Sequence, residues 1–195
     1  MHPLAKLAKL AIETYLKEGK IIEVPKDFPE EFLKRRAGVF VTLEKNGKLR
    51  GCIGTYLPTR VNVAEETIRN AIAAATEDWR FEPVKLDELK EISISVSVLS
   101  YPESVKNIKE LNPKELNPKK YGIVVKNFPL AFPDQEWILD GLLGKEIVSK
   151  TGVLLPDIEG VETAEQQISI ACQKAGIDPQ KEKIFVYKFT VEKYE

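Results

Sequence analysis

The seven residues Leu49-Arg50-Gly51-Cys52-Ile53-Gly54-Thr55 bring together groups that could perform chemistry. Arg50 places a guanidinium two residues before the thiol of Cys52, and a nearby cation is one of the few features that makes cysteine a thiolate at neutral pH. Glycines inside a strand often mark a bulge or the close approach of a backbone or ligand. The stretch therefore indicates a ligand-binding site or a reactive thiol.

Both side chains also have a structural interpretation. The Arg50 guanidinium could clamp a carboxylate or phosphate through two hydrogen bonds, or it could pair with Asp78 or with a glutamate of the chain. The Cys52 thiol could be packed and inert, could bind a ligand without reacting, or could act as a nucleophile. The residue types alone leave these alternatives open.

Two neighbouring segments could complete a site. The turn from Gly54 to Arg60 offers main-chain N–H groups, a hydroxyl and a cation, which are the components of an anion site, although it lacks the spacing of a P-loop. The Asp78-Trp79-Arg80-Phe81 connection could close over the same place, or it could be a salt-bridged helix exit with buried aromatic rings. We predict Cys52 as the catalytic candidate. The predicted ligand-binding residues are Arg50, Gly51, Cys52, Gly54, Thr55, Asp78 and Arg80.

The composition places the chain among ordinary globular proteins. Of its 195 residues, 43% are hydrophobic and 30% are charged, unlike disordered or membrane proteins. The 29 Lys and Arg residues nearly balance the 30 Asp and Glu residues. No general attraction to nucleic acid or anionic lipid is therefore expected, and any anion binding must be local.

A second exclusion follows from the single histidine, His2. A Ser-His-Asp triad, a Cys-His pair within the fold and a His-rich zinc or iron site are not expected in this chain. We predict no metal and no cofactor. An enzyme built on this chain would transfer protons through Asp, Glu, Lys, Tyr or Cys side chains.

The chain shows no secretion signal and no apolar stretch of the roughly 18 to 20 residues that a membrane span needs. We therefore predict a cytoplasmic protein without membrane contact, in which Cys52 and Cys172 stay reduced. The high Lys and Glu content, together with a single Met, is typical of a heat-adapted source.

Local signals predict the elements that would position these residues. Helices are predicted over Pro3–Lys17, Glu30–Arg36, Asn62–Thr76, Asp87–Lys90, Asp134–Leu143 and Thr163–Ala175. Strands are predicted over Gly38–Leu43, Lys48–Ile53, Ile92–Val98, Tyr121–Lys126, Gly152–Leu155 and Ile184–Val191.

The chemistry-bearing stretch lies on the second strand of a hairpin, because Asn46-Gly47 is the strongest short hairpin signal that a sequence offers. A two-residue turn would place Val41 opposite Cys52, which puts the thiol among apolar neighbours. A bulge at Gly51 or a longer loop would shift the register by one residue and reverse those neighbours.

The order of elements favours one fold class. Strands are as numerous as helices and one pair forms a tight hairpin, so the pattern favours α+β with a largely antiparallel sheet packed by helices over a doubly wound parallel sheet. The length fits one large domain or two small lobes.

The run Gly38-Val39-Phe40-Val41-Thr42, followed by Leu49-Arg50-Gly51-Cys52-Ile53-Gly54, resembles the signature of the AMMECR family. The resemblance covers essentially the whole chain and implies a single domain over residues 1–195, with two interleaved lobes in one compact unit. The chain departs from the family pattern in its long segment from Phe128 to Thr151. Further landmarks follow in the family's order, among them Ala73-Ala74-Ala75, Asp78, Arg80-Phe81, Tyr121-Gly122-Ile123, Leu154-Leu155-Pro156 and Lys174-Ala175-Gly176.

The function that this resemblance implies is poorly defined. Relatives in many microbes occur beside, or fused to, a Memo-like domain and a radical-SAM protein, which implies a shared pathway or complex. We expect the protein to bind an anionic small molecule or a partner protein at the Leu-Arg-Gly-Cys-Ile-Gly surface. The alternatives are a thiol-dependent enzyme with Cys52 as nucleophile and a nucleic-acid-binding or regulatory module.

Overall fold

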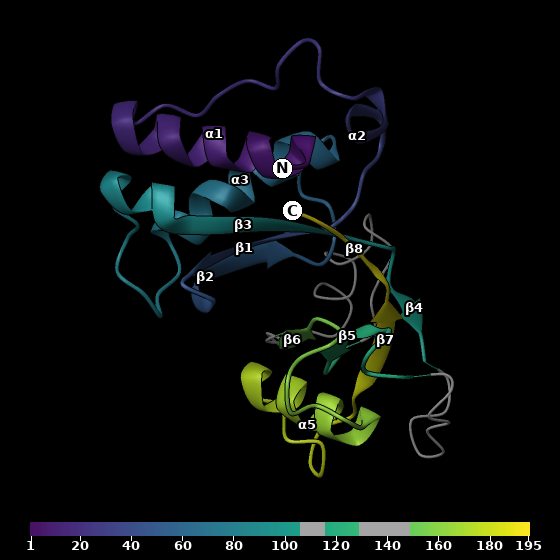
Figure 1. Ribbon diagram of the computed structural model, residues 1–195. Helices are drawn as coiled ribbons and strands as arrows, with labels where there is room; N and C mark the ends of the chain where they lie inside the picture. Colours follow the sequence, from purple (N-terminus) through teal and green to yellow (C-terminus); the bar gives the residue numbers. More distant parts are fainter. Residues whose placement is uncertain (106–115, 129–148) are drawn as a thin grey trace. The chain divides into compact units, whose positions relative to one another are not determined.

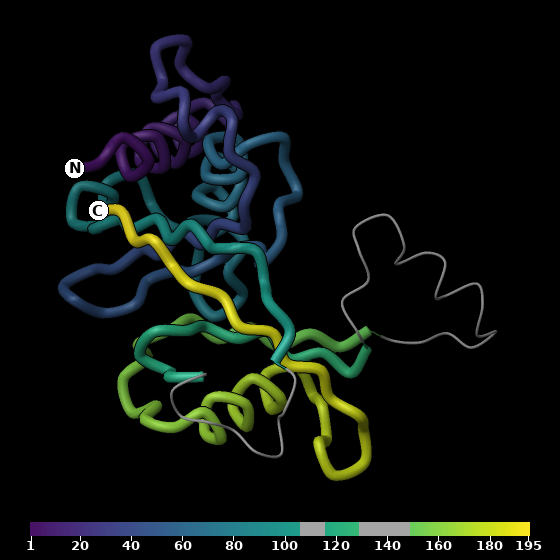
Figure 2. The backbone as a smooth tube through the Cα atoms, turned by 90° about the vertical axis from the view of Figure 1, so that its right-hand side faces the viewer, coloured from purple at the N-terminus to yellow at the C-terminus, as the bar shows by residue number. Residues whose placement is uncertain are grey.

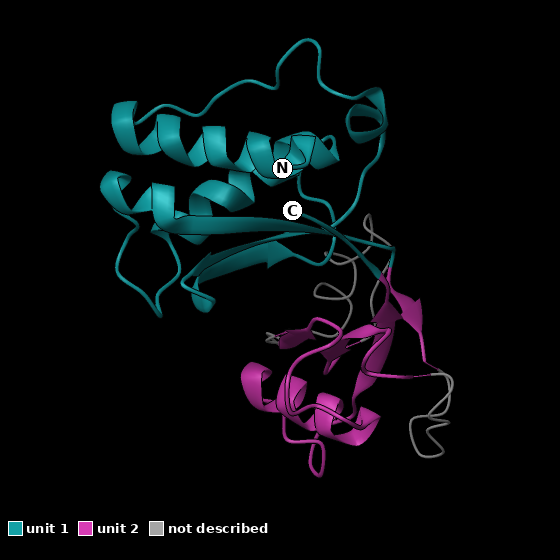
Figure 3. Ribbon diagram, in the orientation of Figure 1, with its two compact units in different colours: residues 1–101, 191–195 teal, residues 102–190 magenta. Residues whose placement is uncertain are grey.

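Two compact units make up the computed structural model, which describes residues 1–105, 116–128 and 149–195. Unit 1 comprises residues 1–101 and 191–195, and unit 2 comprises residues 102–190 (Figure 3). The helix predicted over Asp134–Leu143 lies outside the described residues.

Unit 1 places helices on one face of an antiparallel sheet with the strand order β2-β1-β3-β8 (Figure 1). Val39, Val41 and Leu43 of β1 are completely buried on the face that α1 and α3 cover. The elements of unit 1 are α1 (Pro3–Glu18), α2 (Glu30–Lys34), β1 (Val39–Lys45), β2 (Lys48–Thr55), α3 (Val63–Thr76), the 3-10 helix η1 (Leu86–Glu91), β3 (Ile92–Leu99) and β8 (Val191–Tyr194).

Capping groups confirm the predicted start of α3 and the predicted stop of α1 at Gly19, whereas the helix predicted over Glu30–Arg36 ends at Lys34. The Asn62 side chain accepts the main-chain N–H of Glu65 at 2.9 Å and thereby caps α3. Helix α1 ends at Gly19, which adopts the left-handed conformation with φ 69°. His2 caps the start of α1 and stacks on Tyr194, with ring centroids 4.3 Å apart. The one histidine thus has a structural role at a helix start.

Unit 2 contains a second antiparallel sheet, in which the described strands lie in the order β4-β7-β5-β6. Helix α5 packs against β5 and β6, and its predicted capping box of Thr163 and Gln166 is confirmed. The described elements of unit 2 are β4 (Glu103–Ser104), β5 (Gly122–Lys126), β6 (Thr151–Leu154), α5 (Ala164–Ala175) and β7 (Phe185–Phe189).

The predicted α+β class is confirmed, but the strand predicted over Ile184–Val191 is wrong at its end. The chain divides at Thr190 into β7 and β8, which belong to different sheets. Strand β8 runs beside β3 in unit 1 (Figure 2). Neither a glycine nor a proline marks the division, and the β-branched and aromatic residues continue across it. Composition therefore could not reveal the change of sheet.

The hairpin of β1 and β2 contains a bulge that decides the surroundings of Cys52. Asn46 and Gly47 form the predicted two-residue turn, with φ of 52° and 71°. The register shifts two residues beyond the turn, so that Arg50 has no partner on β1 and Thr42, rather than Val41, lies opposite Cys52. The pairing of Val41 with Cys52 is therefore wrong, because one extra residue exchanges the two faces of the strand.

Candidate functional site

The two glycines of the Leu-Arg-Gly-Cys-Ile-Gly stretch are required by packing within unit 1. A Cβ at Gly51 would lie 2.2 Å from the main-chain oxygen of Ala74, so α3 crosses the strand closely at this point. A Cβ at Gly54 would lie 2.3 Å from the ring of Phe40, which is its cross-strand neighbour. The lack of a side chain at these two glycines therefore lets another part of unit 1 approach the strand closely. This is one of the two usual reasons for a glycine inside a strand.

The Arg50 guanidinium is held by the segment that precedes and includes η1. Its Nη2 and Nε donate to the two carboxylate oxygens of Glu88 at 2.7 and 3.3 Å, and its Nη1 donates to the carbonyl of Glu82 at 2.9 Å. Only 17% of its side chain is exposed. This geometry favours the structural interpretation of Arg50, a pair with a glutamate, over an anion clamp.

Glu88 is the acid in this pair, and its ionised form is strongly favoured. The hydrogen bonds from Arg50 lower the pKa of its carboxyl from 4.5 to about 2, against the opposing effect of burial. The main-chain N–H of Lys85 and the ammonium of Lys45 also donate to it. Arg50 and Glu88 therefore join β2 to η1 as a bidentate ion pair with low exposure.

Asp78 and Arg80 both form hydrogen bonds with the main chain of Cys52, on the edge strand β2 of the sheet. Asp78 Oδ2 accepts the N–H of Cys52 at 2.8 Å, and Arg80 Nη2 donates to the carbonyl of Cys52 at 3.2 Å. The two side chains also pair with each other, with Nη2–Oδ2 and Nε–Oδ1 distances of 2.7 and 2.8 Å. Of the predicted residues, Cys52, Asp78 and Arg80 therefore do come together.

The Asp78 carboxylate is buried, with 3% of its side chain exposed, whereas 40% of the Arg80 side chain is exposed. The hydrogen bonds from Arg80 lower the pKa of Asp78 from 3.8 to about 2, and the N–H of Cys52 lowers it further, while burial acts in the opposite direction. The predicted salt-bridged helix exit is thus present. Its aromatic part differs from the prediction, because Trp79 is 90% exposed.

The Cys52 thiol is half-buried and points to the face of β2 that carries Thr42 on the neighbouring strand. Its Sγ lies 3.3 Å from Thr42 Oγ1. Both cysteines lie in the described part of the chain, and neither forms a disulfide. The roles of Cys52 as a nucleophile or as a ligand-binding group stay predictions.

The turn after β2 does hold an anion, and that anion is Glu66 of the same unit. Glu66 is completely buried in the first turn of α3. Its carboxylate accepts the hydroxyls of Thr55 and Thr59 at 2.7 and 2.8 Å and the main-chain N–H groups of Thr59 and Arg60, each at 2.7 Å. The donor groups that the sequence offers in this turn therefore serve a carboxylate of the same unit. The position of Glu66, six residues after Arg60, gave no sign of this contact.

Within 1–105, 116–128 and 149–195, no three His, Cys, Asp or Glu side chains are grouped so that they could hold a metal ion. The helices in these ranges all fall short of the length and apolarity needed to cross a bilayer.

Comparison with known proteins identifies relatives along the whole chain. A family model described as AMMECR1 matches residues 5–194. A protein from Thermotoga maritima is 49% identical over 195 residues, which cover 100% of this chain and 98% of that protein. A protein from Clostridium acetobutylicum is 42% identical over 193 residues, but the chain spans only 34% of its length.

A solved structure has the same fold. The crystal structure of an uncharacterised protein from Pyrococcus horikoshii superposes with a TM-score of 0.79 at 36% identity, over 97% of this chain and 88% of that one. Relatives from thermophiles such as Thermotoga maritima accord with the Lys- and Glu-rich composition. The family match over nearly all residues confirms the resemblance seen in the signature, and the chain belongs to the AMMECR1 family.

Proposed function

We propose that this protein is a cytoplasmic binding module that recognises a partner protein through one exposed surface of unit 1, called here the Trp79 surface. The observation that carries the proposal is the 90% exposure of Trp79 directly between Asp78 and Arg80. The Trp79 surface consists of Trp79 and the side chain of the next residue, Arg80, which is 40% exposed.

Two ion pairs support a stable arrangement of this surface. Asp78 and Arg80 bind the main chain of Cys52, and Arg50 binds Glu88. These contacts tie β2, the 77–85 connection and η1 together, and each of the three segments carries an exposed apolar side chain. Leu49 is 44% exposed and Leu86 is 41% exposed. A tryptophan on a fixed backbone loses little conformational freedom when a partner covers it.

The energetic argument favours a protein partner. A tryptophan side chain can bury roughly 150 to 250 Å², and at about 25 cal/mol per Å² its burial contributes several kcal/mol. Tryptophan and arginine are also the residue types most enriched in binding hot spots. An anionic small molecule at the same place would instead have to compete with Asp78 for Arg80 and with Glu88 for Arg50.

The Clostridium acetobutylicum relative supports a modular role. Because the chain spans only 34% of that protein, the same kind of unit there forms part of a longer polypeptide. The partners that the family resemblance implies are a Memo-like protein and a radical-SAM protein.

Fluorescence titration tests the proposal directly. Substitution Trp137→Phe leaves Trp79 as the only tryptophan of the two in the chain. We expect its emission to shift to the blue when the Memo-like or the radical-SAM protein of the same organism is added, because Trp79 leaves water. Calorimetry with Trp79→Ala should show binding weakened by at least about tenfold, which corresponds to about 1.4 kcal/mol.

The control substitution is Tyr101→Ala, which removes an aromatic side chain that is 54% exposed and lies outside the Trp79 surface. It should leave binding unchanged. Unchanged Trp79 emission with both proteins would reject them as partners at this surface. Equal binding by Trp79→Ala and the unsubstituted protein would reject the surface itself.

A further inference from the structure

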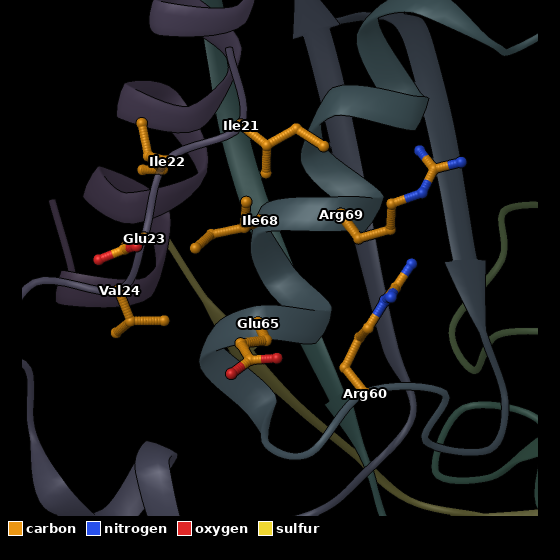
Figure 4. A pocket seen from close by; sticks show the side chains of 8 residues that line it. All are labelled: Ile21, Ile22, Glu23, Val24, Arg60, Glu65, Ile68 and Arg69. Atoms are coloured by element: carbon orange, nitrogen blue, oxygen red, sulfur yellow. The ribbon is translucent and has the colours of Figure 1, made fainter.

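A pocket of about 480 Å³ lies in unit 1 between α3 and the segment that follows α1 (Figure 4). This volume is within the range of roughly 300 to 1,000 Å³ that is typical of small-molecule sites. Its apolar lining consists of Ile21, Ile22, Val24 and Ile68. Its charged lining consists of Glu23, Arg60, Glu65 and Arg69.

Some of the charged side chains that line the pocket already form ion pairs within the protein, and others do not. Arg69 is occupied, because its guanidinium donates to both carboxylate oxygens of Glu77 at 2.8 and 3.0 Å. Arg60 and Glu65 are not: among the described residues, neither side chain forms a hydrogen bond or an ion pair. The pocket thus offers a ligand the cation of Arg60 and the carboxylate of Glu65, whereas the second carboxylate of the lining, that of Glu23, points away from both of them (Figure 4).

The backbone on which these two side chains stand is fixed. Glu66 accepts the main-chain N–H of Arg60 at 2.7 Å, and Asn62 accepts the main-chain N–H of Glu65 at 2.9 Å. Figure 4 shows the guanidinium groups of Arg60 and Arg69 on the same side of the pocket, with the isoleucines on the other. A ligand would meet groups whose main chain is already ordered, which lowers the entropic cost of binding.

The apolar wall is incompletely covered in this structure. Ile21 is 65% exposed, although Ile68 beneath the pocket is only 3% exposed. An aliphatic group placed against this wall would remove apolar surface from water, at roughly 25 cal/mol per Å². The wall therefore favours a ligand with a branched aliphatic body.

We propose that this pocket binds a small zwitterion with an aliphatic body, such as a branched-chain α-amino acid or a short apolar peptide. The ligand carboxylate takes two hydrogen bonds from the Arg60 guanidinium, and its ammonium group pairs with the Glu65 carboxylate. A simple anion would be repelled by Glu65, and a simple cation by Arg60. This site is independent of the proposed partner binding, because it shares no residue with the Trp79 surface.

Isothermal titration calorimetry of the intact protein tests this site. The probes are L-leucine and L-leucyl-L-leucine, which separate the amino acid from the peptide as the source of the zwitterion. We expect at least one of the two to bind. N-acetyl-L-leucine lacks the ammonium, L-leucinamide lacks the carboxylate and glycine lacks the aliphatic body, so each should bind at least about tenfold more weakly.

Variants identify the protein groups. Arg60→Gln and Glu65→Gln should each weaken binding at least about tenfold, whereas the control substitutions Arg36→Gln and Glu159→Gln, at exposed positions outside the pocket, should not. Circular dichroism verifies that each variant is folded. Absence of binding by both L-leucine and L-leucyl-L-leucine would overturn the proposal, as would binding of N-acetyl-L-leucine as tight as that of L-leucine, or binding that is unaffected by Arg60→Gln or by Glu65→Gln.

Discussion

The carboxylate of Asp78 accepts the main-chain N–H of Cys52 at 2.8 Å, on the outer edge of the sheet in unit 1. An edge strand normally presents unpaired N–H and C=O groups that another chain can use as a template. Arg80 binds the carbonyl of the same residue. The main-chain groups of Cys52 are therefore already hydrogen-bonded to side chains of the same unit. A partner protein cannot add a strand to the sheet at this point and must contact side chains instead.

The substitution Asp78→Asn should destabilise the protein by about 2 kcal/mol at neutral pH. The pKa of Asp78 is about 2 instead of 3.8, so the folded state binds fewer protons than the unfolded state. The stabilisation is present above about pH 4 and is lost as the pH falls toward 2. Urea unfolding followed by circular dichroism should show a difference between the two proteins that shrinks below pH 4.

Two further substitutions sharpen this experiment. Asp27→Asn alters an exposed loop residue and should leave the unfolding midpoint within about 0.5 kcal/mol of the original. Glu88→Gln should behave like Asp78→Asn, because Arg50 holds the pKa of Glu88 at about 2. A stability difference that stays constant down to pH 2 would show that these carboxylates are not the acid-sensitive contacts.

Local signals in the sequence were sufficient for most of the elements. Some signals act within a few residues, such as the helix caps at Asn62 and Thr163 and the turn at Asn46-Gly47. A short stretch of sequence is therefore enough to predict them. The sequence offers a bulge at Gly51 only as an alternative to the regular hairpin, whereas the structure has the bulge at Arg50. The bulge turns the Arg50 side chain toward Glu88, which lies 38 residues further along the chain. A contact between residues so far apart cannot be predicted from local sequence signals.

The candidate site shows the same division between local and distant information. Sequence reasoning selected Cys52, Asp78 and Arg80, which the fold brings together. It missed Glu66, because a glutamate in the first turn of a helix looks like an ordinary favourable charge near the helix dipole. Only the path of the 55–60 turn over α3 reveals that this carboxylate is completely buried.

The substitution Gly51→Ala should lower the free energy of unfolding more than Gly19→Ala does, although Gly19 has the more unusual backbone conformation. A Cβ at Gly51 would lie 2.2 Å from the main-chain oxygen of Ala74, so β2 and α3 must separate, at a cost of about 3 kcal/mol. At Gly19 the space is open but φ is +69°, which costs an alanine about 1 kcal/mol. Urea unfolding of both variants measures the comparison, and a smaller loss for Gly51→Ala would disprove the close crossing.

Alkylation should distinguish the two thiols. Cys172 is 2% exposed, and burial raises the pKa of its thiol, whereas Cys52 is half-buried on an edge strand. We expect iodoacetamide to modify Cys52 in the folded protein and Cys172 only after unfolding in urea, as mass spectrometry of the peptides can show. The pH dependence of the Cys52 rate, measured in a Cys172→Ala background, tests the thiol-enzyme alternative. A rate that reaches its plateau below neutral pH would favour a catalytic thiol over the binding module.

The substitution Glu66→Ala should open an anion site where the carboxylate lay. It leaves two hydroxyls and two main-chain N–H groups, contributed by Thr55, Thr59 and Arg60, without their acceptor. Unsatisfied buried donors and the new cavity together should cost about 3 kcal/mol or more. Acetate can enter this space and accept the same hydrogen bonds. We therefore expect acetate to raise the Tm of Glu66→Ala more than chloride at equal ionic strength.

The comparison with Glu165→Ala isolates this effect, because Glu165 is an exposed acid in the first turn of α5 and accepts none of these four hydrogen bonds. Acetate should not act differently from chloride on Glu165→Ala or on the original protein. If Glu66→Ala does not fold, Glu66→Gln keeps the shape of the side chain while directing an amide N–H toward the donors, and it should still lose stability. An equal rise in Tm with acetate and chloride would mean that the turn does not recognise an anion, since ionic strength alone would then account for the rescue.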